Sequence, residues 1–547
     1  MLESESKIKN ILFDLISIQS DTGTSLELDI EKYIYDWLQK LDYFKHNVNN
    51  LGCYPLVDDS LKRSIVWGLI KGEGKKTVIL LTHHDAVDSY DYHILKDYAY
   101  DPDLLRTMLK NVNLEKEVKD DLNSGEWIFA RGAADMKAGI AIQMSLIEQY
   151  SKQETLNGNI LIISVPDEES LSQGMRNCAK LLETIKDIHD LNYTLLIDSE
   201  PHQKSETNAG FFHTGSVGKL MPVVYVRGKK AHIGDVFKGF NPIPLLSQIV
   251  SVTELNPDFS DDAADEVSPP PSWGFFRDEK KRYDASIPES CGGYFSILTL
   301  KRTPKVILDQ LLKLSKDAFE SVLCQMNRNY SIYLTKKNES QHKLPWESNV
   351  KIFAQIYKEA ISNFGDEFLE DYRLTLDKLA MDIKNDIISL PESNLAIIGK
   401  TLEYIEDKAP IVVIAFSPPY YPHVSIDNFT DLDKSICDID NTIIRIADEL
   451  CNEIYSKKNY FMGLSDMSYT SLCESQNIIP HVKSNMPLWG TMYDIPFETI
   501  SLLNIPSINI GPGGKDLHKF TERVLENDVI NQTPKLIAGV INHIFNK

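Results

Sequence analysis

The sequence predicts an α/β protein with a doubly wound sheet and a smaller α+β domain inserted into it. Short apolar runs alternate with amphipathic stretches in the first part of the chain, which is typical of a largely parallel sheet covered by helices. Near residue 213 the pattern becomes strand–helix–strand–helix, and the earlier alternation returns later in the chain. The length of 547 residues also exceeds what one hydrophobic core usually supports.

Residues 1–212 are expected to form the first part of the catalytic α/β domain. Two amphipathic helices are predicted within residues 5–43, because apolar residues recur there at helical spacing. Strands and helices are then expected to alternate, with strands at 64–70, 77–85, 159–165 and 193–200 and helices at 138–151 and 172–185.

Residues 213–335 are expected to form the inserted domain. "MPVVYVRGKKAHIG" reads as a half-buried strand with a sharp turn, and a helix is predicted at about 242–254. Residues 256–290 are acidic and proline-rich, which favours a long loop or insertion. The strand "GGYFSILTLKRTP" and a helix at 304–325 complete this domain.

Residues 336–547 are expected to return to the catalytic domain as its second part. Helices are predicted over roughly 348–410 and at 435–457. The strands "APIVVIAFS" and "SINIGPGG" and a closing helix at 532–545 are taken to resume the α/β pattern.

Composition narrows the classes of partner and the compartment. The chain has 57 basic and 79 acidic residues, a net charge of −22, which argues against nucleic acid or an anionic membrane as the main partner. No apolar run approaches the roughly 18 residues of a membrane span, and "MLESESKIKN" lacks the apolar core of a signal peptide. The seven scattered cysteines form no CxxC pair, so free thiols and a cytoplasmic location are expected.

Histidines and carboxylates gather at the ends of the predicted strands. Those that follow a strand or open a helix are His83, His84, Asp85, Asp135, Asp167, Glu168, Glu169, Asp198, Glu200 and His518. In an open α/β sheet, ligands bind outside the carboxyl ends of the strands, so these side chains are expected to meet in one crevice. Nitrogen and oxygen donors without sulfur predict a site for zinc, cobalt or manganese.

The acidic run in "SVPDEES" follows an apolar strand, where adjacent carboxylates would repel one another. Two divalent cations would neutralise that repulsion. Glu168 and Glu169 point in different directions, so one can bind metal while the other acts as a base on water, as hydrolysis of an amide requires. His83 and Asp85 share a strand face, where Asp85 can accept the second ring N–H of His83.

Five segments resemble, in order, the motifs of one protein family: "HHDAV", "RGAADMKAG", "PDEES", "DSEP" and "GPGGKDLHKFTE". They are similar to those of the co-catalytic two-zinc aminoacylase and exopeptidase family, which includes carboxypeptidase G, succinyl-diaminopimelate desuccinylase and acetylornithine deacetylase. "FSPPYYPHV" and "NMPLWG" resemble its bacterial arginine-utilisation members. The resemblance covers nearly the whole chain and implies a zinc-exopeptidase-like mixed sheet with an inserted ferredoxin-like lid.

The resemblance also implies a role for each matching residue. Two divalent metal ions, with Zn²⁺ expected ahead of Co²⁺ or Mn²⁺, would be held by Asp135 between them, by His83 and Glu200 at one ion, and by Glu169 and His518 at the other. Glu168 would be the general base and Asp85 would orient His83. His232, in "GKKAHIG", matches a lid histidine that reaches across a homodimer to stabilise the oxyanion.

Several positions keep an alternative. His84 could replace His83 as a ligand, although H-x-D favours the first histidine. Asp198 could replace Glu200, since the two lie on the same face of a strand. Asp167 is expected to be a hydrogen-bonded loop carboxylate rather than a metal contact.

A second group lies outside the expected ligand set. Asp466, in "GLSDMSYTS", fits a helix N-cap or loop role as well as a place near the site. Arg302 could bind a substrate carboxylate or lie exposed at a strand end. The pocket candidates of the subgroup, each with a structural alternative, are His423, Asn485 and Trp489. The glycines of "GPGG" lack the Gly-Lys-Ser/Thr of a phosphate loop.

The function expected from these residues is metal-dependent hydrolysis of an amide bond in a small N-acyl amino acid or short peptide, with a place in arginine catabolism. A family member that has lost catalysis and binds a ligand or partner is the alternative from a different class. A two-metal phosphoesterase uses the same ligand types and is a third possibility. It is disfavoured because the acid pair and the lid histidine of this chain follow the amidohydrolase pattern.

Overall fold

The protein is described by a computed structural model that covers residues 2–205, 209–280, 282–472 and 475–547. The chain divides into two compact units. Unit 1 consists of residues 1–217, 424–473 and 496–547, and unit 2 consists of residues 218–423 and 474–495.

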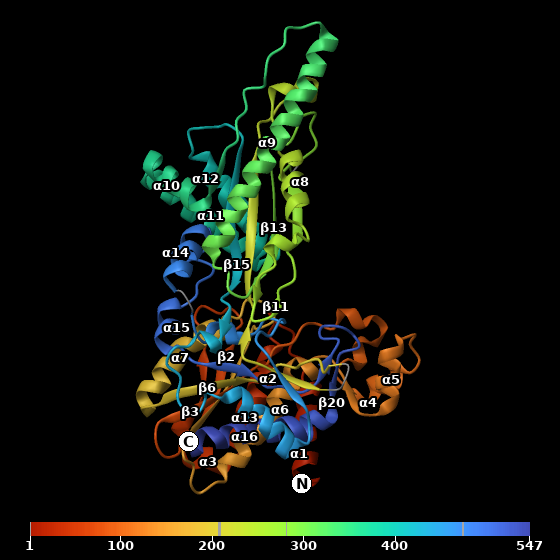
Figure 1. The fold of residues 1–547 in the computed structure, drawn as a ribbon, viewed down its shortest axis with the longest axis vertical. Helices are drawn as coiled ribbons and strands as arrows, with labels where there is room; N and C mark the ends of the chain where they lie inside the picture. The colour runs from red at the N-terminus through yellow and green to blue at the C-terminus, as the bar shows by residue number, and fades with distance from the viewer. Residues whose placement is uncertain (1, 206–208, 281, 473–474) are drawn as a thin grey trace. The chain divides into compact units, whose positions relative to one another are not determined.

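Unit 1 is built on a mixed sheet, as the sequence predicts (Figure 1). Its eight described strands lie in the order β1 (Leu51–Pro55), β2 (Ser64–Ile70), β5 (Asn159–Val165), β3 (Lys76–His83), β6 (Asn192–Asp198), β18 (Ser507–Asn509), β7 (Gly210–His213) and β17 (Tyr455–Lys458). The central strands β5, β3, β6 and β18 are parallel, so their carboxyl ends meet at one edge of the sheet.

Helices cover both faces of this sheet. The described helices of unit 1 are α1 (Leu2–Ser17), α2 (Glu27–Gln39), α3 (Asp42–His46), α4 (Pro102–Leu109), α5 (Lys116–Ser124), α6 (Ala138–Ser151), α7 (Gln173–His189), α13 (Ile439–Ile446), α15 (Phe497–Leu503) and α16 (Thr533–Asn546). One apolar core joins α1, α6 and α16 to Val78 and Leu80 of β3. Ile79 and Leu81 are equally buried and alternate with them, so β3 is apolar on both faces, as a covered parallel strand should be.

Two short antiparallel sheets complete unit 1. One joins β19 (Gly514–Lys515), β20 (Arg523–Leu525) and β4 (Trp127–Phe129), and the other pairs β8 (Gly215–Ser216) with β16 (Val424–Ser425). The pairing of β20 with β4 brings the C-terminal part of the chain to the segment before α6.

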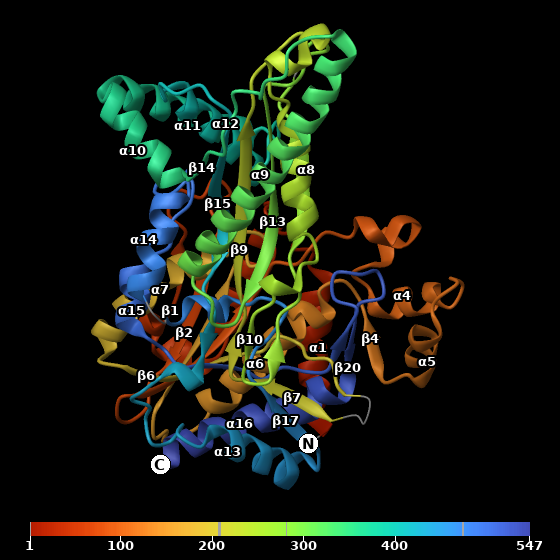
Figure 2. The same ribbon diagram turned by 45° about the horizontal axis from the view of Figure 1, so that its top comes forward.

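Unit 2 is built on a second mixed sheet, visible with its helices in Figure 2. Its described strands lie in the order β12 (Ser272–Asp278), β13 (Ser290–Thr299), β9 (Gly218–Arg227), β15 (Ile411–Tyr421) and β14 (Val350–Ile352), with a small separate pair β10 (Asp262–Ala263) and β11 (Glu266–Val267). The described helices are α8 (Pro242–Thr253), α9 (Pro304–Lys337), α10 (Phe353–Phe364), α11 (Asp366–Lys384), α12 (Leu390–Glu403) and α14 (Ser475–Asn485). A core of α10, α11 and α12 packs on Val223, Tyr225 and Val413 of the sheet.

Two sequence expectations about unit 2 differ from the structure. The run "APIVVIAFS" forms most of β15, which pairs antiparallel with β9 in unit 2 rather than joining the sheet of unit 1. The structure therefore returns to unit 1 at residue 424, whereas the sequence placed the start of the second catalytic part at 336. An apolar strand fits either sheet equally well, and only the long-range pairing with β9 decides between them.

The acidic, proline-rich segment 256–290 is also more ordered than the long loop that was expected. Residues 272–278 within it form β12, which pairs antiparallel with β13. The reason is aromatic packing across the pair, since Trp273 stacks on Phe295 and Phe275 stacks on Tyr294.

Two further findings concern the cysteines and the length of the helices. The six cysteines that the structure describes are free thiols, and Cys473 lies outside the described residues. Within the described part of the chain, every helix is too short or too polar to cross a membrane.

Candidate metal centre

Four loops of unit 1 carry the predicted ligands to the carboxyl edge of the sheet. His83 is the last residue of β3, Asp135 lies in the turn before α6, and Glu169 and Glu200 follow β5 and β6. A fifth segment, between β19 and β20, contributes His518. The central parallel strands end together here, which is why sequence positions so far apart become neighbours.

The five side chains form a continuous chain of contacts. His83 Nε2 lies 3.0 Å from Asp135 Oδ1 and 3.4 Å from Glu200 Oε1. On the other side, His518 Nε2 lies 3.3 Å from Asp135 Oδ2 and 3.0 Å from Glu169 Oε2. Asp135 therefore directs one carboxylate oxygen toward each histidine and lies between two groups of donors.

Asp85 contacts three residues at this edge of the sheet: His83, Glu168 and Glu169. His83 Nδ1 makes a 3.0 Å hydrogen bond with the backbone carbonyl oxygen of Asp85, and one carboxylate oxygen of Asp85 lies 3.5 Å from the same nitrogen. Its two oxygens also accept the backbone N–H groups of Glu168 and Glu169, each at 3.1 Å. Asp85 thus contacts the histidine and also holds the backbone of the acidic pair, and the sequence did not predict the second contact.

His83, rather than His84, faces the cluster. His84 Nδ1 contacts the hydroxyl of Ser164 at 3.0 Å, and burial lowers the pKa of His84 to about 3. The ring is therefore neutral and belongs to the packing between β3 and β5.

Glu200, rather than Asp198, reaches His83. Asp198 accepts hydrogen bonds from the Ser465 hydroxyl at 2.5 Å and from the Ser199 amide at 2.8 Å, which hold its carboxylate away from the cluster. Gly511 lets the chain pass close behind Glu200, because a Cβ there would lie 2.0 Å from the Glu200 carbonyl oxygen.

Asp167 has a protein cation as its partner. Arg63 Nη1 lies 2.8 Å from Asp167 Oδ1 and 2.8 Å from Glu27 Oε1. Asp167 also accepts the Gln173 amide at 3.1 Å, so it is the hydrogen-bonded loop carboxylate that the sequence predicts. The partner Arg63, which directly precedes β2, was missed because its sequence context is that of an ordinary strand end.

The electrostatics of the cluster favour a bound cation. Burial and the neighbouring Asp135 raise the pKa of Glu169 to about 7, and burial raises the pKa of Glu168 and of Glu200 well above the ordinary value. Hydrogen bonds to Asp135 and Glu169 raise the pKa of His518 to about 10. These carboxylates repel one another, and a local positive charge would relieve that repulsion.

The residues that the sequence analysis placed outside the expected ligand set have different environments in the structure. Arg302 Nη1 donates to the Asp258 carbonyl at 2.8 Å, and Asn485 joins α14 to α10 through the Ala354 amide at 3.1 Å, so both contribute to packing in unit 2. His423 is buried, and Trp489 lies beside Tyr493. Both belong to unit 2. Gly513, in "GPGG", donates its amide to Asp528 at 2.9 Å rather than to a phosphate.

His232 and Asp466 have opposite exposures. His232 is exposed in unit 2, where its ring accepts the Gly234 amide at 3.1 Å. Asp466 is only 3% exposed in unit 1, and burial raises its pKa to about 8, with His83 and Asp198 nearby. Its sequence signal, a short loop motif, did not reveal how deeply it is buried.

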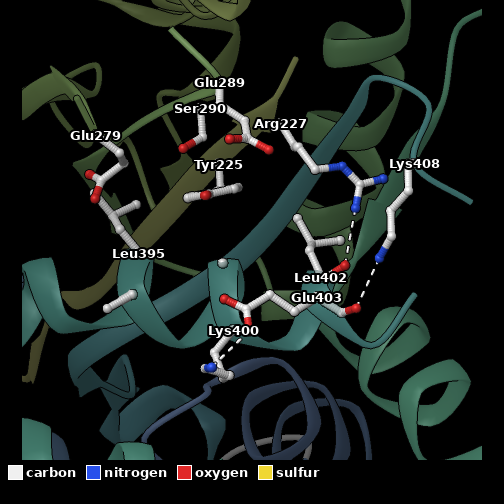
Figure 3. Close-up of a pocket in the computed structure, with 12 residues that line it drawn as sticks. Tyr225, Arg227, Glu279, Glu289, Ser290, Leu395, Lys400, Leu402, Glu403 and Lys408 are labelled. Atoms are coloured by element: carbon white, nitrogen blue, oxygen red, sulfur yellow. Dashed lines mark hydrogen bonds and ion pairs between the residues drawn. The ribbon is translucent and has the colours of Figure 1, made fainter. Parts of the chain in front are cut away.

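Unit 2 contains a cavity of about 440 Å³, whose lining includes Arg227 and Lys408 (Figure 3). Its basic residues already have protein partners: Arg227 donates to the carbonyls of Leu402, Asp407 and Ala409 at 3.1, 2.7 and 2.9 Å, and Lys408 donates to the Glu403 carbonyl at 2.9 Å. These carbonyls lie at and just beyond the end of α12, so the basic residues stabilise a helix end.

Unit 1 thus combines a doubly covered mixed sheet with histidines and carboxylates gathered at its strand ends, which is the arrangement of a metal-dependent hydrolase. The model of peptidase family M20/M25/M40 matches residues 111–490. The chain belongs to this family.

Relatives match the chain over its full length. It is 30% identical to "Uncharacterized protein YqjN" of Bacillus subtilis over 545 residues, 99% of this chain and 96% of the relative. It is 29% identical to "Protein RocB" of the same organism over 544 residues, 98% of this chain and 95% of the relative. A tripeptidase structure from Staphylococcus aureus shares the fold, with a TM-score of 0.53 and 15% identity over 99% of both chains.

The residues present fit the metal that this family implies. Ligand atoms of His83, Asp135 and Glu169 all lie within 4.8 Å of one another, a spacing that could hold an ion. Glu169 Oε1 is buried and finds no hydrogen-bond partner among the described residues. Imidazole and carboxylate donors suit a divalent ion of the first transition series.

Proposed function

We propose that the protein is a co-catalytic two-metal hydrolase that cleaves the amide bond of a small N-acyl amino acid or a short peptide. The observation that carries this proposal is the position of Asp135 between two groups of donors. Asp135 contacts His83 and His518 through different carboxylate oxygens. Membership of the peptidase family supports amide hydrolysis as the type of reaction.

The ligand set divides into two halves that share Asp135. His83 and Glu200 would hold one ion, and Glu169 and His518 would hold the other. Each half thus contains one imidazole and one carboxylate besides Asp135, which suits Zn²⁺ and also Co²⁺ or Mn²⁺. Two bound divalent ions would supply Lewis acidity at the amide carbonyl and lower the pKa of the attacking water.

Glu168 is the residue proposed to move the proton. It lies next to Glu169 in the chain, and Asp85 fixes its backbone by accepting the 3.1 Å hydrogen bond from its amide. The Glu168 carboxylate accepts a proton from water as the oxygen attacks the carbonyl carbon, and then donates it to the nitrogen as the C–N bond breaks. The products are a carboxylate and an amine.

Finer assignments belong to the same proposal. The resemblance to the family motifs supports four of them: unit 1 as the catalytic domain, unit 2 as the lid, oxyanion stabilisation by His232, and a homodimer formed through the lid. A place in arginine catabolism rests on the resemblance of "FSPPYYPHV" and "NMPLWG" to arginine-utilisation members of the family. The free thiols that the structure describes support a cytoplasmic location.

The test is hydrolysis by the full-length protein after loading with Zn²⁺, Co²⁺ or Mn²⁺. A panel of N-acyl amino acids and dipeptides, with a phosphomonoester included, identifies the reaction class. We expect two ions per chain and release of an amino acid. Glu168→Gln should reduce kcat by about 10²- to 10⁴-fold and leave the metal content unchanged.

The matched control is Asp187→Asn, an acid-to-amide change at an exposed position of α7, which should leave kcat unchanged. Normal hydrolysis by Glu168→Gln would show that the base is misassigned. A metal-loaded protein that hydrolyses nothing in the panel would favour a ligand-binding member of the family, and cleavage of the phosphomonoester alone would favour a phosphoesterase.

A further inference from the structure

Glu522 is a fully buried acid close to the candidate metal centre that has no part in the ligand set. It lies four residues after His518, and its side chain is 1% exposed. A carboxylate so deeply buried requires strong partners, because burial alone disfavours its charged form. Its partners show what it does.

The carboxylate of Glu522 holds the turn that carries Asp135. Oε1 accepts the backbone N–H of Ala134 at 3.0 Å and that of Asp135 itself at 3.2 Å. Oε2 accepts a hydrogen bond from Arg131 Nη1 at 2.9 Å. The position of Asp135 therefore depends on a residue that belongs to the His518 segment.

Arg131 extends the connection in the other direction. Its second terminal nitrogen, Nη2, contacts the Asp91 carboxylate and lies 3.5 Å from the backbone carbonyl oxygen of His518. Arg131 is also fully buried, so its geometry is restricted by these contacts. One guanidinium thus joins Glu522, at the Asp135 turn, to the backbone of His518.

The surrounding fold keeps Glu522 in register. β20 pairs antiparallel with β4, with Arg523 opposite Phe129, so Arg131 and Glu522 emerge next to each other from the two strands. On the His518 side, Asp516 closes the segment by accepting hydrogen bonds from Thr521 Oγ1 at 2.9 Å and from Arg523 Nη1 at 2.5 Å.

We propose that Glu522, through Arg131, is a positioning residue that fixes Asp135 and His518 relative to each other so that the two can share a metal centre. The inference rests on the proposed function, since it concerns the same pair of ions. His518 needs such support because its side chain is 49% exposed and receives little packing of its own. Contacts of this kind around metal ligands typically change metal affinity by 10- to 100-fold.

Because the partners of Glu522 are hydrogen-bond donors, a substitution that removes one acceptor oxygen tests its role. Arg131 and the backbone amides of Ala134 and Asp135 all donate to the Glu522 carboxylate, and an amide side chain has only one acceptor oxygen. Glu522→Gln therefore keeps the size of the side chain but leaves either Arg131 or the two amides facing an NH₂ group. The matched control is Glu526→Gln in the same segment, where Glu526 pairs with Lys9 near the surface at 2.7 Å.

The experiment measures Zn²⁺ affinity by competition with a chromophoric chelator, and the absorption spectrum of the Co²⁺-loaded full chain. We expect Glu522→Gln to bind at least one of the two ions about 10- to 100-fold more weakly and to show an altered Co²⁺ spectrum. Glu526→Gln should match the parent protein in both measurements. Unchanged affinity and spectrum in Glu522→Gln would overturn the inference and leave the proposed function standing.

A second variant guards against a folding defect. Asp91 has a side chain that is 36% exposed, so Asp91→Asn should fold even if Glu522→Gln does not. Asp91→Asn weakens the ion pair with Arg131 and should lower Zn²⁺ affinity by a smaller factor than Glu522→Gln does. A Zn²⁺ affinity equal to that of the parent protein would count against the connection through Arg131. A parent protein that binds no divalent metal would overturn the proposed function and this inference together.

Discussion

The guanidinium of Arg63 lies 2.8 Å from the carboxylate of Asp167, and both side chains are almost completely buried. The same Arg63 nitrogen lies 2.8 Å from the buried Glu27, and Asp59 contacts the other side of the guanidinium at 3.0 Å. One arginine therefore contacts three buried acids, and burial raises the pKa of one of them, Glu27, to about 8. The first acid of the run 167–169 is paired with a protein cation, whereas Glu169 contacts His518 in the candidate metal centre.

Arg63→Ala should strongly destabilise unit 1. Removing the arginine leaves Glu27, Asp59 and Asp167 buried without their cation, and breaking a buried ion pair in this way typically costs about 3–5 kcal/mol. The measurement is urea-induced unfolding followed by tryptophan fluorescence. Arg63→Lys should lose less, because the charge remains while the hydrogen bonds of the fork are reduced.

Lys45→Ala is the matched control for this measurement. Lys45 pairs with Asp42 at 2.8 Å, but the two side chains are 54% and 88% exposed. An exposed pair contributes about 0–1 kcal/mol, so this variant should unfold close to the parent protein. Equal stability of the Arg63 and Lys45 variants would contradict the importance assigned to the buried network.

His83→Ala and His84→Ala should separate metal binding from stability. His83 contacts Asp135 and Glu200, so its loss should weaken Zn²⁺ binding by at least about 100-fold. The His84 ring hydrogen-bonds the Ser164 hydroxyl, so its loss should cost about 1–3 kcal/mol of stability and leave Zn²⁺ affinity unchanged. Titration with Zn²⁺ and thermal unfolding distinguish the two, and a loss of metal in the His84 variant alone would reverse the assignment.

The strands that carry the site were predictable because their signals are local. β2 and β5 have the predicted bounds, and β3 and β6 differ from them by one or two residues at each end. Buried parallel strands read as continuous apolar runs, which is a strong pattern in one short window. The partner of β15 was not predictable in this way, because an apolar run carries no information about which of two sheets it joins.

That the side chains of the candidate site gather together was predictable from residue type and spacing, but the residues that support them were not. His83, Asp135 and Glu169 lie in motifs that a single sequence displays, and the structure brings them together. Arg63 and Glu522 act through partners at distant positions, 104 residues from Asp167 in one case and 388 from Ala134 in the other. Such contacts arise from strand pairing, so no local pattern signals them.

Glu200→Gln and Asp198→Asn should identify the acid that completes the His83 half of the centre. Glu200 Oε1 lies 3.4 Å from His83 Nε2, so Glu200→Gln should release or weaken one ion of the pair. In Asp198→Asn the amide oxygen can still accept a hydrogen bond, so two ions should remain bound. Metal analysis after dialysis gives the stoichiometry, and the opposite pattern would make Asp198 the ligand.

Asp85→Asn should lower both metal affinity and kcat, because Asp85 contacts two proposed metal-binding residues, His83 and Glu169, and also the proposed base Glu168. Its carboxylate accepts the amides of Glu168 and Glu169 on separate oxygens, whereas an asparagine offers one acceptor and turns a donor toward the other amide. A loss of about 10- to 100-fold in Zn²⁺ affinity is expected, as for other groups that orient metal-binding histidines. Asp88→Asn, an exposed acid-to-amide change three residues further on, is the control and should alter neither quantity. If Asp85→Asn kept full metal affinity and lost only kcat, Asp85 would serve the acidic pair and not His83.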